Sequence, residues 1–166
     1  MMTDFAIRAM TPLDWESVRE IYAEGIATGI ATFETGPPTW GKWDAGHLPF
    51  GRFVAEEAGK VLGWVALSRV TDRCVYQGVA EVSVYVGGDS RGKGVGQRLL
   101  GKLIEASEAN GIWTLNAAVF PQNKASIALH QKMGFRIIGY RERIAQRDGQ
   151  WHDNVLLERR SIVVGV

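Results

Sequence analysis

Hydrophobic residues along the chain recur every second residue in some segments and every third or fourth in others, which separates predicted strands from predicted helices. In the first half, strands are predicted at residues 5–10, 53–55, 61–67 and 79–86. Thr11 and Pro12 predict the start of a helix, because threonine caps helices and proline fits the first turn. Residues 31–34 are expected to be a short extended piece, and residues 40–48, with two glycines, a weak helix.

The second half opens with the most clearly periodic segment, a helix predicted over residues 95–110. A strand at 113–119 and a helix at 123–133 follow. Strands at 135–139 and 151–157 close the chain, with a turn at Asp148 and Gly149. The apolar stripe of the first helix consists of Val95, Leu99, Leu100, Leu103 and Ile104.

This order of elements predicts a mixed α/β domain. Consecutive strands in the first half favour a mostly antiparallel sheet, and the helical crossovers place helices on its faces. With about seven strands and no linker or repeat, residues 1–166 are expected to form a single domain.

Composition narrows the class of protein. Hydrophobic residues make up 46% and charged residues 22%, and the net charge is +1, so we expect no nucleic-acid or membrane partner. Residues 1–6 do not resemble a secretory signal, no apolar run is long enough to span a bilayer, and Cys74 is the one cysteine. A cytoplasmic location is therefore predicted. No metal site is expected, since His47, His130 and His152 lack ligand spacing.

A glycine-rich loop joins the strand at 79–86 to the helix at 95–110. A helix N-terminus that follows such a loop binds anions, because its free backbone N–H groups and its dipole favour negative charge. Arg91 and Lys93 add positive charge. The loop is not the phosphate loop of nucleotide triphosphatases, and it is not the dinucleotide fingerprint, which requires glycine where Gln97 stands.

What the loop matches is Arg-x-x-Gly-x-Gly, at residues 91–96, after the strand end Val-Tyr-Val. This resembles the cofactor signature of the GNAT superfamily of N-acetyltransferases. Residues 123–135, an asparagine opening a helix that ends in Gly-Phe, are similar to the second motif of that family. Residues 31–34, 81–86 and 149–153 are similar to its phosphinothricin and methionine sulfoximine acetyltransferase group. The resemblance covers nearly the whole chain and implies the GNAT fold.

The resemblance implies acetyl-CoA as the acetyl donor. Backbone N–H groups of the loop would bind the pyrophosphate, the strand end would pair with the pantetheine arm, and a bulge in that strand would open the slot. Asn123 would contact the cofactor from the second helix, and the alternative is a simple N-cap. The implied cofactor residues are Val84, Tyr85, Val86, Arg91, Gly92, Lys93, Gly94, Val95, Gly96, Gln97, Asn123 and Ser126.

The implied chemistry is direct attack of a neutral amine on the thioester. Glu81 is the candidate base, because a partly buried carboxylate has a raised pKa; alternatively it only binds the substrate ammonium. His130 is the candidate proton donor to the thiolate, with a helix-packing histidine as the alternative and Tyr85 as a second donor. A backbone N–H near Val84 or Val86 would polarise the carbonyl. Cys74 is not expected to be a nucleophile.

The implied acceptor is a small amino acid with a carboxylate and a polar side group. Arg73 is the predicted carboxylate ligand, with Arg69 second. Phe33 is predicted to wall the pocket or to be plain core, and Val82 and Ser83 to line it. Better-known sulfoximine-type members carry other residues at 70–73 and a histidine where Val82 stands. These differences affect the expected identity of the acceptor amino acid and leave the expected cofactor unchanged.

Two other classes of function remain open at this point. One is an acetyltransferase for a different amine, such as an aminoglycoside-like drug, a polyamine or a protein N-terminus. The other is a non-catalytic acyl-CoA-binding module, against which Glu81 and His130 argue. A homodimer is expected from the resemblance, with Trp40, Trp43 and Trp151 as candidate interface or pocket residues.

Overall fold

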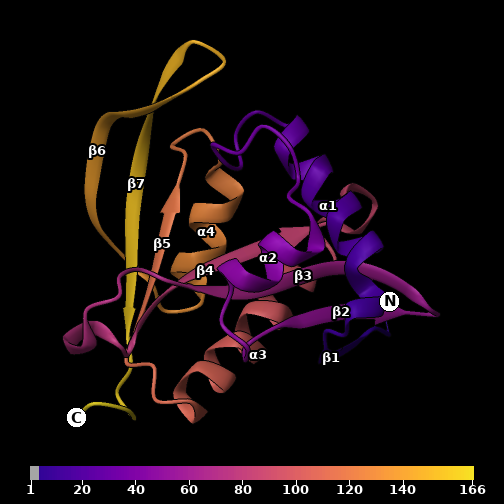
Figure 1. Cartoon of the computed structure of the whole chain (residues 1–166), viewed down its shortest axis with the longest axis horizontal. Coiled ribbons are helices and arrows are strands. Elements are labelled where there is room, and N and C mark those ends of the chain that lie inside the picture. Colours follow the sequence, from indigo (N-terminus) through magenta and orange to yellow (C-terminus); the bar gives the residue numbers. More distant parts are fainter. Residues whose placement is uncertain (1–3) are drawn as a thin grey trace.

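A computed structural model describes residues 4–166, and one twisted sheet carries all of its strands (Figure 1). The strand order is β1-β2-β3-β4-β5-β7-β6, and every neighbouring pair is antiparallel except β4 and β5. The mixed α/β architecture predicted from the sequence is thus confirmed. The strands are β1 (Ala6–Ala9), β2 (Phe53–Glu57), β3 (Lys60–Arg69), β4 (Val79–Val86), β5 (Thr114–Val119), β6 (Arg136–Arg147) and β7 (Gln150–Arg160).

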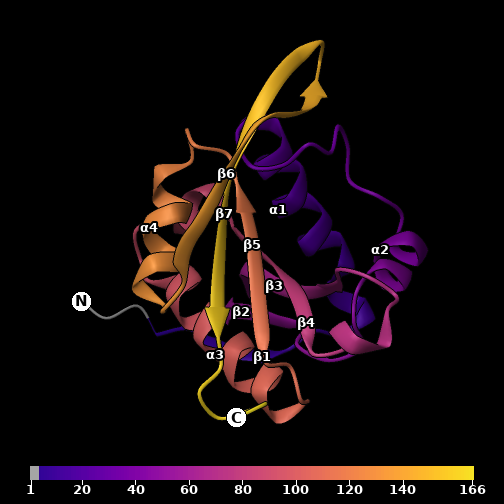
Figure 2. The same ribbon diagram turned by 90° about the vertical axis from the view of Figure 1, so that its left-hand side faces the viewer.

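Helices cover both faces of the sheet, as Figure 2 shows. On one face lie α1 (Trp15–Ala27) and α2 (Trp40–Gly46), and on the other α3 (Val95–Ala109) and α4 (Lys124–Lys132). Alternation along β3 supplies both cores, since Trp64 packs with Trp15 and Trp43 beneath the first pair, while Val65 packs with Leu99 beneath α3. The predicted stripe on α3 is fully or nearly fully buried.

Strands β4 and β5 pair over the first three residues of each and then diverge. They pair only from Val79↔Thr114 to Glu81↔Asn116, after which β4 continues beside β3 and β5 continues beside β7. The register between β3 and β4 is unbroken from Arg69↔Ala80 to Gly63↔Val86, so the expected bulge is absent from that ladder. The gap arises instead from divergence of two strands that each keep their outer partner.

The closing hairpin is longer than the sequence indicated, since β6 runs to Arg147 where the predicted strand ends at residue 139, and β7 runs to Arg160 where the predicted strand ends at residue 157. Its tip projects past the rest of the sheet (Figure 1). Residues 31–34 belong to no strand and form a bent connection between α1 and α2. The first helix starts as a 3-10 turn at Pro12–Asp14, and Asp14 accepts a hydrogen bond from the Thr11 backbone N–H at 2.8 Å.

No helix in the described part of the chain has the length and apolar character that a membrane crossing requires. Cys74 is exposed and free. Residues 1–3, which belong to the segment predicted not to be a secretory signal, lie outside the described residues. The cytoplasmic location stays a prediction.

Candidate active site

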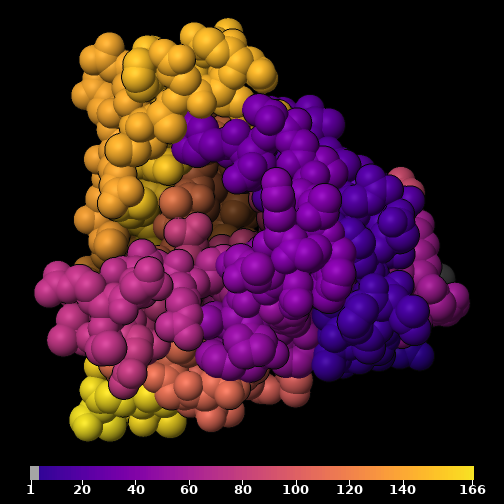
Figure 3. Space-filling model, viewed as in Figure 1, coloured from indigo at the N-terminus to yellow at the C-terminus, as the bar shows by residue number. Residues whose placement is uncertain are grey.

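A cleft of about 970 Å³ opens where β4 and β5 diverge. Its walls come from β4, the loop before α3, α4, the end of β5, the hairpin and the segment between α1 and α2. Figure 3 shows the hollow between the hairpin and that segment. Lining residues alternate along β4, so Glu81, Ser83 and Tyr85 approach from the α1 face and Val82, Val84 and Val86 from the α3 face. The cleft therefore passes through the sheet.

The α3 end of the cleft is built to receive an anion. The first helical hydrogen bond of α3 runs from the Arg98 N–H to the Gly94 carbonyl at 3.2 Å, so the preceding N–H groups have no helical partner. Gly92 and Gly94 have φ of +77° and +79°, and a Cβ on either would meet open space. Arg91 lines the cleft here, whereas Lys93 is exposed and lies outside the lining.

Gly96, the last glycine of the Arg-x-x-Gly-x-Gly segment, allows two helices to pack closely. A Cβ on Gly96 would lie 3.1 Å from a methyl carbon of Leu129, so its absence lets α4 approach α3. Asn123 caps α4, because its side chain accepts the Ser126 N–H at 3.2 Å, and both residues line the cleft. The cap and a cofactor contact are compatible, since the cap uses only the amide oxygen.

The open edge of β4 is the second feature suited to the cofactor. Beyond Glu81 no strand within residues 4–166 pairs with the β5-facing edge of β4, whose backbone groups there border the cleft. An extended pantetheine arm carries amide groups that fit such an edge as an added strand would. Val84, Tyr85 and Val86 all line the cleft, and their contact with the pantetheine arm stays a prediction.

Glu81 occupies the last paired position of β4 against β5, at the point where the cleft begins. Its carboxyl reaches solvent through the cleft, yet the surrounding protein removes enough water to raise its pKa, while the Arg141 charge acts in the opposite direction. A carboxyl in such surroundings holds a proton more readily than a free glutamate does.

Tyr85 is held in an aromatic stack on the same face. Its ring stacks on Trp64 and on Tyr22, each with a centroid distance of 4.9 Å. A Cβ at Gly25 of α1 would lie 2.7 Å from the Tyr85 ring, so glycine is needed there. Burial, with nearby phenol and carboxyl groups, raises the pKa of Tyr85 well above its usual value. Its phenol therefore keeps its proton.

His130 is 4% exposed, and its Nδ1 lies 2.7 Å from the Ser126 carbonyl oxygen. A carbonyl only accepts, so we assign the proton to Nδ1. Burial lowers the pKa of His130, and the neutral ring then carries a lone pair on Nε2. The ring also stands edge-on to Phe135 at 5.1 Å. This geometry favours the helix-packing alternative over proton donation.

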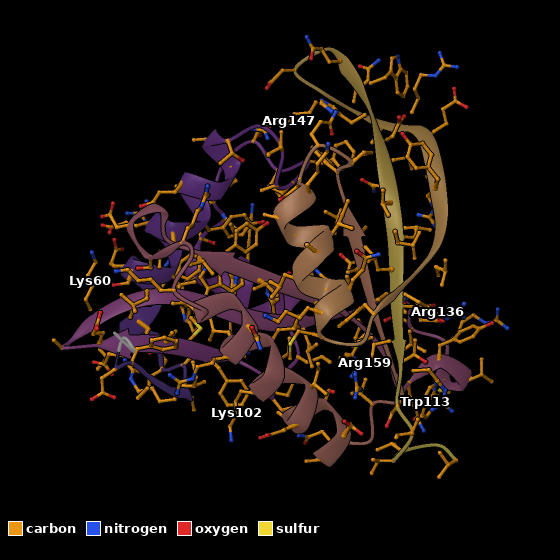
Figure 4. All side chains as sticks on the ribbon, turned by 180° about the vertical axis from the view of Figure 1, so that it is seen from behind. Lys60, Lys102, Trp113, Arg136, Arg147 and Arg159 are labelled. Carbon is orange, nitrogen blue, oxygen red and sulfur yellow. The ribbon has the colours of Figure 1, made fainter. Side chains whose placement is uncertain are left out.

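The segment between α1 and α2 is fixed by an arginine from the hairpin (Figure 4). The Arg147 guanidinium donates to the Ile26 carbonyl at 2.6 Å and to the Thr32 carbonyl at 3.1 Å. The Arg147 side chain is only 10% exposed. Next to Thr32, Phe33 lines the cleft and packs edge-on against Phe120 at 4.7 Å, which fits the predicted pocket wall.

The structure does not bring Arg73 or Arg69 to the cleft. Arg69 is exposed at the end of β3, and the chain then turns away through a 3-10 turn at Cys74–Tyr76. The Arg73 guanidinium lies over the Tyr76 ring at 5.5 Å. The cleft contains Arg141 and Asn154 instead. Sequence analysis missed them because Arg141 lies beyond the predicted strand 135–139, so Asn154, inside the predicted strand 151–157, had no predicted partner across the hairpin.

Among residues 4–166, no three His, Cys, Asp or Glu side chains lie close enough together to hold a metal ion. The titratable side chains that line the cleft are Glu34, Glu81, Tyr22, Tyr85, His47, His130, Arg91, Arg141 and Lys132, beside the backbone groups of β4 and of the start of α3.

Comparisons with known proteins agree with this geometry. The sequence profile of the acetyltransferase (GNAT) family matches residues 15–135. The phosphinothricin N-acetyltransferase of Alcaligenes faecalis is 35% identical over 162 residues, covering 92% of this chain and 81% of its own length. The L-methionine sulfoximine/L-methionine sulfone acetyltransferase of Pseudomonas paraeruginosa is 38% identical over 105 residues, 63% of this chain and 61% of that protein.

Among solved structures, a GNAT superfamily phosphinothricin acetyltransferase from Sinorhizobium meliloti in complex with acetyl-CoA superposes with a TM-score of 0.85. It is 30% identical, and the match covers 96% of this chain and 89% of that one.

Proposed function

Because this chain belongs to the acetyltransferase (GNAT) family, and so is an N-acetyltransferase that takes its acetyl group from acetyl-CoA, we propose that its acceptor is the amino group of a small amino acid. The proposed acceptors are of the phosphinothricin, methionine sulfoximine or methionine sulfone type, on which the named relatives act. The observation that carries the proposal is the position of Glu81, at the mouth of the gap between β4 and β5.

The residues present fit the cofactor. The free N–H groups at the start of α3 bind its pyrophosphate, and the open edge of β4 pairs with its pantetheine arm. Acetyl-CoA supplies the thioester whose carbonyl carbon receives the amine. A backbone N–H of β4 beyond Glu81, where the described strands leave that edge unpaired, would polarise the carbonyl oxygen.

Glu81 removes the proton that the attacking amine must lose. Its raised pKa makes it a stronger base than an ordinary glutamate, and its place on the α1 face leaves the opposite face to the cofactor. Tyr85 is the proposed donor of the proton that the departing thiolate needs, because its protonated phenol lines the cleft on the same face as Glu81. His130 packs α4 against Phe135.

The test is a free-thiol release assay with acetyl-CoA and a panel of amines. The panel holds phosphinothricin, methionine sulfoximine, methionine sulfone, common amino acids, a polyamine and an aminoglycoside. Turnover of the first three in preference to the rest is expected. Preferred turnover of the polyamine or the aminoglycoside would contradict the proposed acceptor, and a thermal shift by acetyl-CoA without thiol release would favour the binding-module alternative.

The expected homodimer is the second part of the proposal. Large apolar side chains are exposed along the hairpin, of which β6 is an edge strand. A second copy of this chain would cover them and end the open edge of the sheet. These side chains, here called the hairpin patch, are Ile137, Ile138, Tyr140, Ile144 and Trp151.

A further inference from the structure

Two polar residues face each other across the closing hairpin and line the cleft. Arg141 of β6 pairs directly with Asn154 of β7. Side chains of directly paired residues lie on the same face of a sheet, so the guanidinium and the amide are neighbours. Both belong to the wall of the cleft that contains Glu81.

Neither residue is fully satisfied by the protein. Asn154 is 8% exposed, and its buried Oδ1 has no hydrogen-bond partner among residues 4–166. A buried acceptor without a donor is costly and rare. The guanidinium of Arg141 makes no hydrogen bond and no ion pair with the described residues, unlike that of Arg147 nearby on the same strand. The two side chains together form an unused polar surface inside the cleft.

The backbone of β6 fixes Arg141 in this place. After the pair Arg141↔Asn154 the register shifts, so that the next pair is Ala145↔His152. Asp153 holds the resulting bulge, since it accepts hydrogen bonds from the Arg143 backbone N–H and from the Tyr140 hydroxyl. A bulge of this kind re-aims the side chains beside it.

Charge in the cleft is divided between its two ends. Among residues 4–166, three Arg or Lys side chains line it, and two of them come from the side of α3 and α4: Arg91 in the loop before α3, and Lys132 in the last turn of α4. Arg141 is the cation whose charge reaches Glu81, yet the two side chains form no ion pair within 4.0 Å. The space between them suits a ligand that carries both a positive and a negative group.

We propose that Arg141 and Asn154 form the subsite for the carboxylate of the acceptor, and that this subsite makes the enzyme prefer α-amino acids to amines without an acidic group. The guanidinium binds the carboxylate, and the Asn154 Nδ2 group can donate a second hydrogen bond to it. The Asn154 Oδ1, an acceptor, is left for a donor of the ligand such as its amino group. The Arg141 charge repels polyamines, which adds discrimination. The inference rests on the proposed function, since it places the amino group of the same ligand at Glu81.

The test compares L-methionine sulfone with its α-carboxamide and with 3-(methylsulfonyl)propylamine, which lacks the carboxyl group. Arg141→Gln is expected to lower kcat/KM for methionine sulfone about 10- to 100-fold, mainly through KM, and to leave kcat/KM for the two analogues without a carboxylate within about threefold. Arg141→Lys should lie between. Arg143→Gln is the matched control, because it removes the same charge two residues away, from a side chain outside the cleft.

Equal preference of the wild-type enzyme for all three amines, or an equal effect of Arg141→Gln and Arg143→Gln, would overturn the subsite and leave the acetyltransferase proposal standing. Calorimetric binding of methionine sulfone to the complex with coenzyme A gives a measurement that needs no turnover. There, wild-type binding that Arg141→Gln abolishes supports the subsite even if no amine in the panel is acetylated. Absence of wild-type binding overturns it.

Asn154→Leu separates a ligand contact from a structural role. Leucine has nearly the shape of asparagine and removes the unpaired acceptor, so the melting temperature should stay equal or rise. If Asn154 contacts the acceptor, KM for methionine sulfone should nevertheless rise about tenfold. A fall in melting temperature with unchanged KM would assign Asn154 to the fold alone.

Discussion

Two effects act on the pKa of the Glu81 carboxyl group in opposite directions. Burial in the cleft raises its pKa, and the Arg141 charge lowers it again. The carboxylate form is the base, so activity is present above this pKa and is lost as pH falls through it. The fall in rate at acid pH therefore depends on the pKa of Glu81, which the surroundings of that residue set.

We predict that kcat/KM of the wild-type enzyme falls at acid pH with an apparent pKa above 4.5, the ordinary value for glutamate. Glu81→Gln should lower turnover by about 10²- to 10⁴-fold and remove this acid limb, with little change in acetyl-CoA affinity. Arg141→Gln should move the limb to higher pH, because it removes the charge that favours the carboxylate. An acid limb that persists in Glu81→Gln would assign it to another group.

A second prediction concerns the proton that the thiolate receives. His130→Asn keeps an N–H in place of Nδ1–H for the Ser126 carbonyl but has no counterpart of Nε2. We expect kcat within about threefold of wild type and a loss of about 1–3 kcal/mol in the free energy of unfolding. Tyr85→Phe should lower kcat by about 100-fold at unchanged stability. The reverse pattern in kcat would return the donor role to His130.

The residues that sequence analysis placed in the cleft share one property, namely that a short local pattern positions them. Glu81 alternates on a strongly apolar strand, and Asn123 opens a helix, so each position follows from its neighbours. Arg73 and Arg141 depend on how distant segments meet. Nothing near Arg73 indicates that the chain turns away after β3, and nothing near Arg141 indicates its partner Asn154. Long-range pairing of this kind leaves no periodic trace.

At the scale of secondary-structure elements, the glycine that precedes α3 can be compared with the glycine that follows it. Gly94 before the helix and Gly111 after it both have φ of +79° and open space where a Cβ would stand. Only Gly94 lines the cleft.

We predict that Gly94→Asp weakens coenzyme A binding by about 100-fold or more, because a carboxylate would face the pyrophosphate. Gly111→Asp should cost similar stability through the same backbone strain and leave coenzyme A affinity unchanged. Isothermal titration with both variants, together with their melting temperatures, makes the comparison. Equal affinities for the two variants would remove the loop from the cofactor site.

The Arg147 contacts join two elements that are more than a hundred residues apart in the sequence. Arg147→Met should leave two carbonyls without donors and release the segment that carries Phe33. We predict that KM for the amine rises about tenfold, that KM for acetyl-CoA does not change, and that stability falls by about 1–3 kcal/mol. Arg143→Met is the control. An unchanged amine KM would show that the contacts serve stability only.

The hairpin also shows why strand lengths were underestimated. Most residues of β6 beyond residue 139 are exposed, so they need not alternate between apolar and polar. The buried strands β3 and β4, in contrast, were placed within one or two residues. Hydrophobic periodicity therefore indicates which residues are buried, and it gives the length of a strand only where the whole strand is buried.

At the scale of the whole molecule, the hairpin patch predicts self-association. Sedimentation should give a dimer at micromolar concentration, and the melting temperature should rise with protein concentration. Ile137→Lys should shift the equilibrium toward monomer. Leu13→Lys, at a residue that is 94% exposed away from the hairpin, should not. A wild-type monomer at all concentrations would contradict the proposal.

The proposed sites for the two ligands of the cleft come from different parts of the sequence as well as from different parts of the cleft. In the proposed arrangement the donor is received by residues 82–132, whereas the acceptor walls, apart from β4, come from residues 30–34 and from the hairpin. An exchange of the hairpin and of that short connection would therefore alter which amine is accepted without rebuilding the acetyl-donor half. Descendants of one ancestral gene could acquire new acceptors by drift in about thirty residues, and a protein engineer could graft the same segments between relatives.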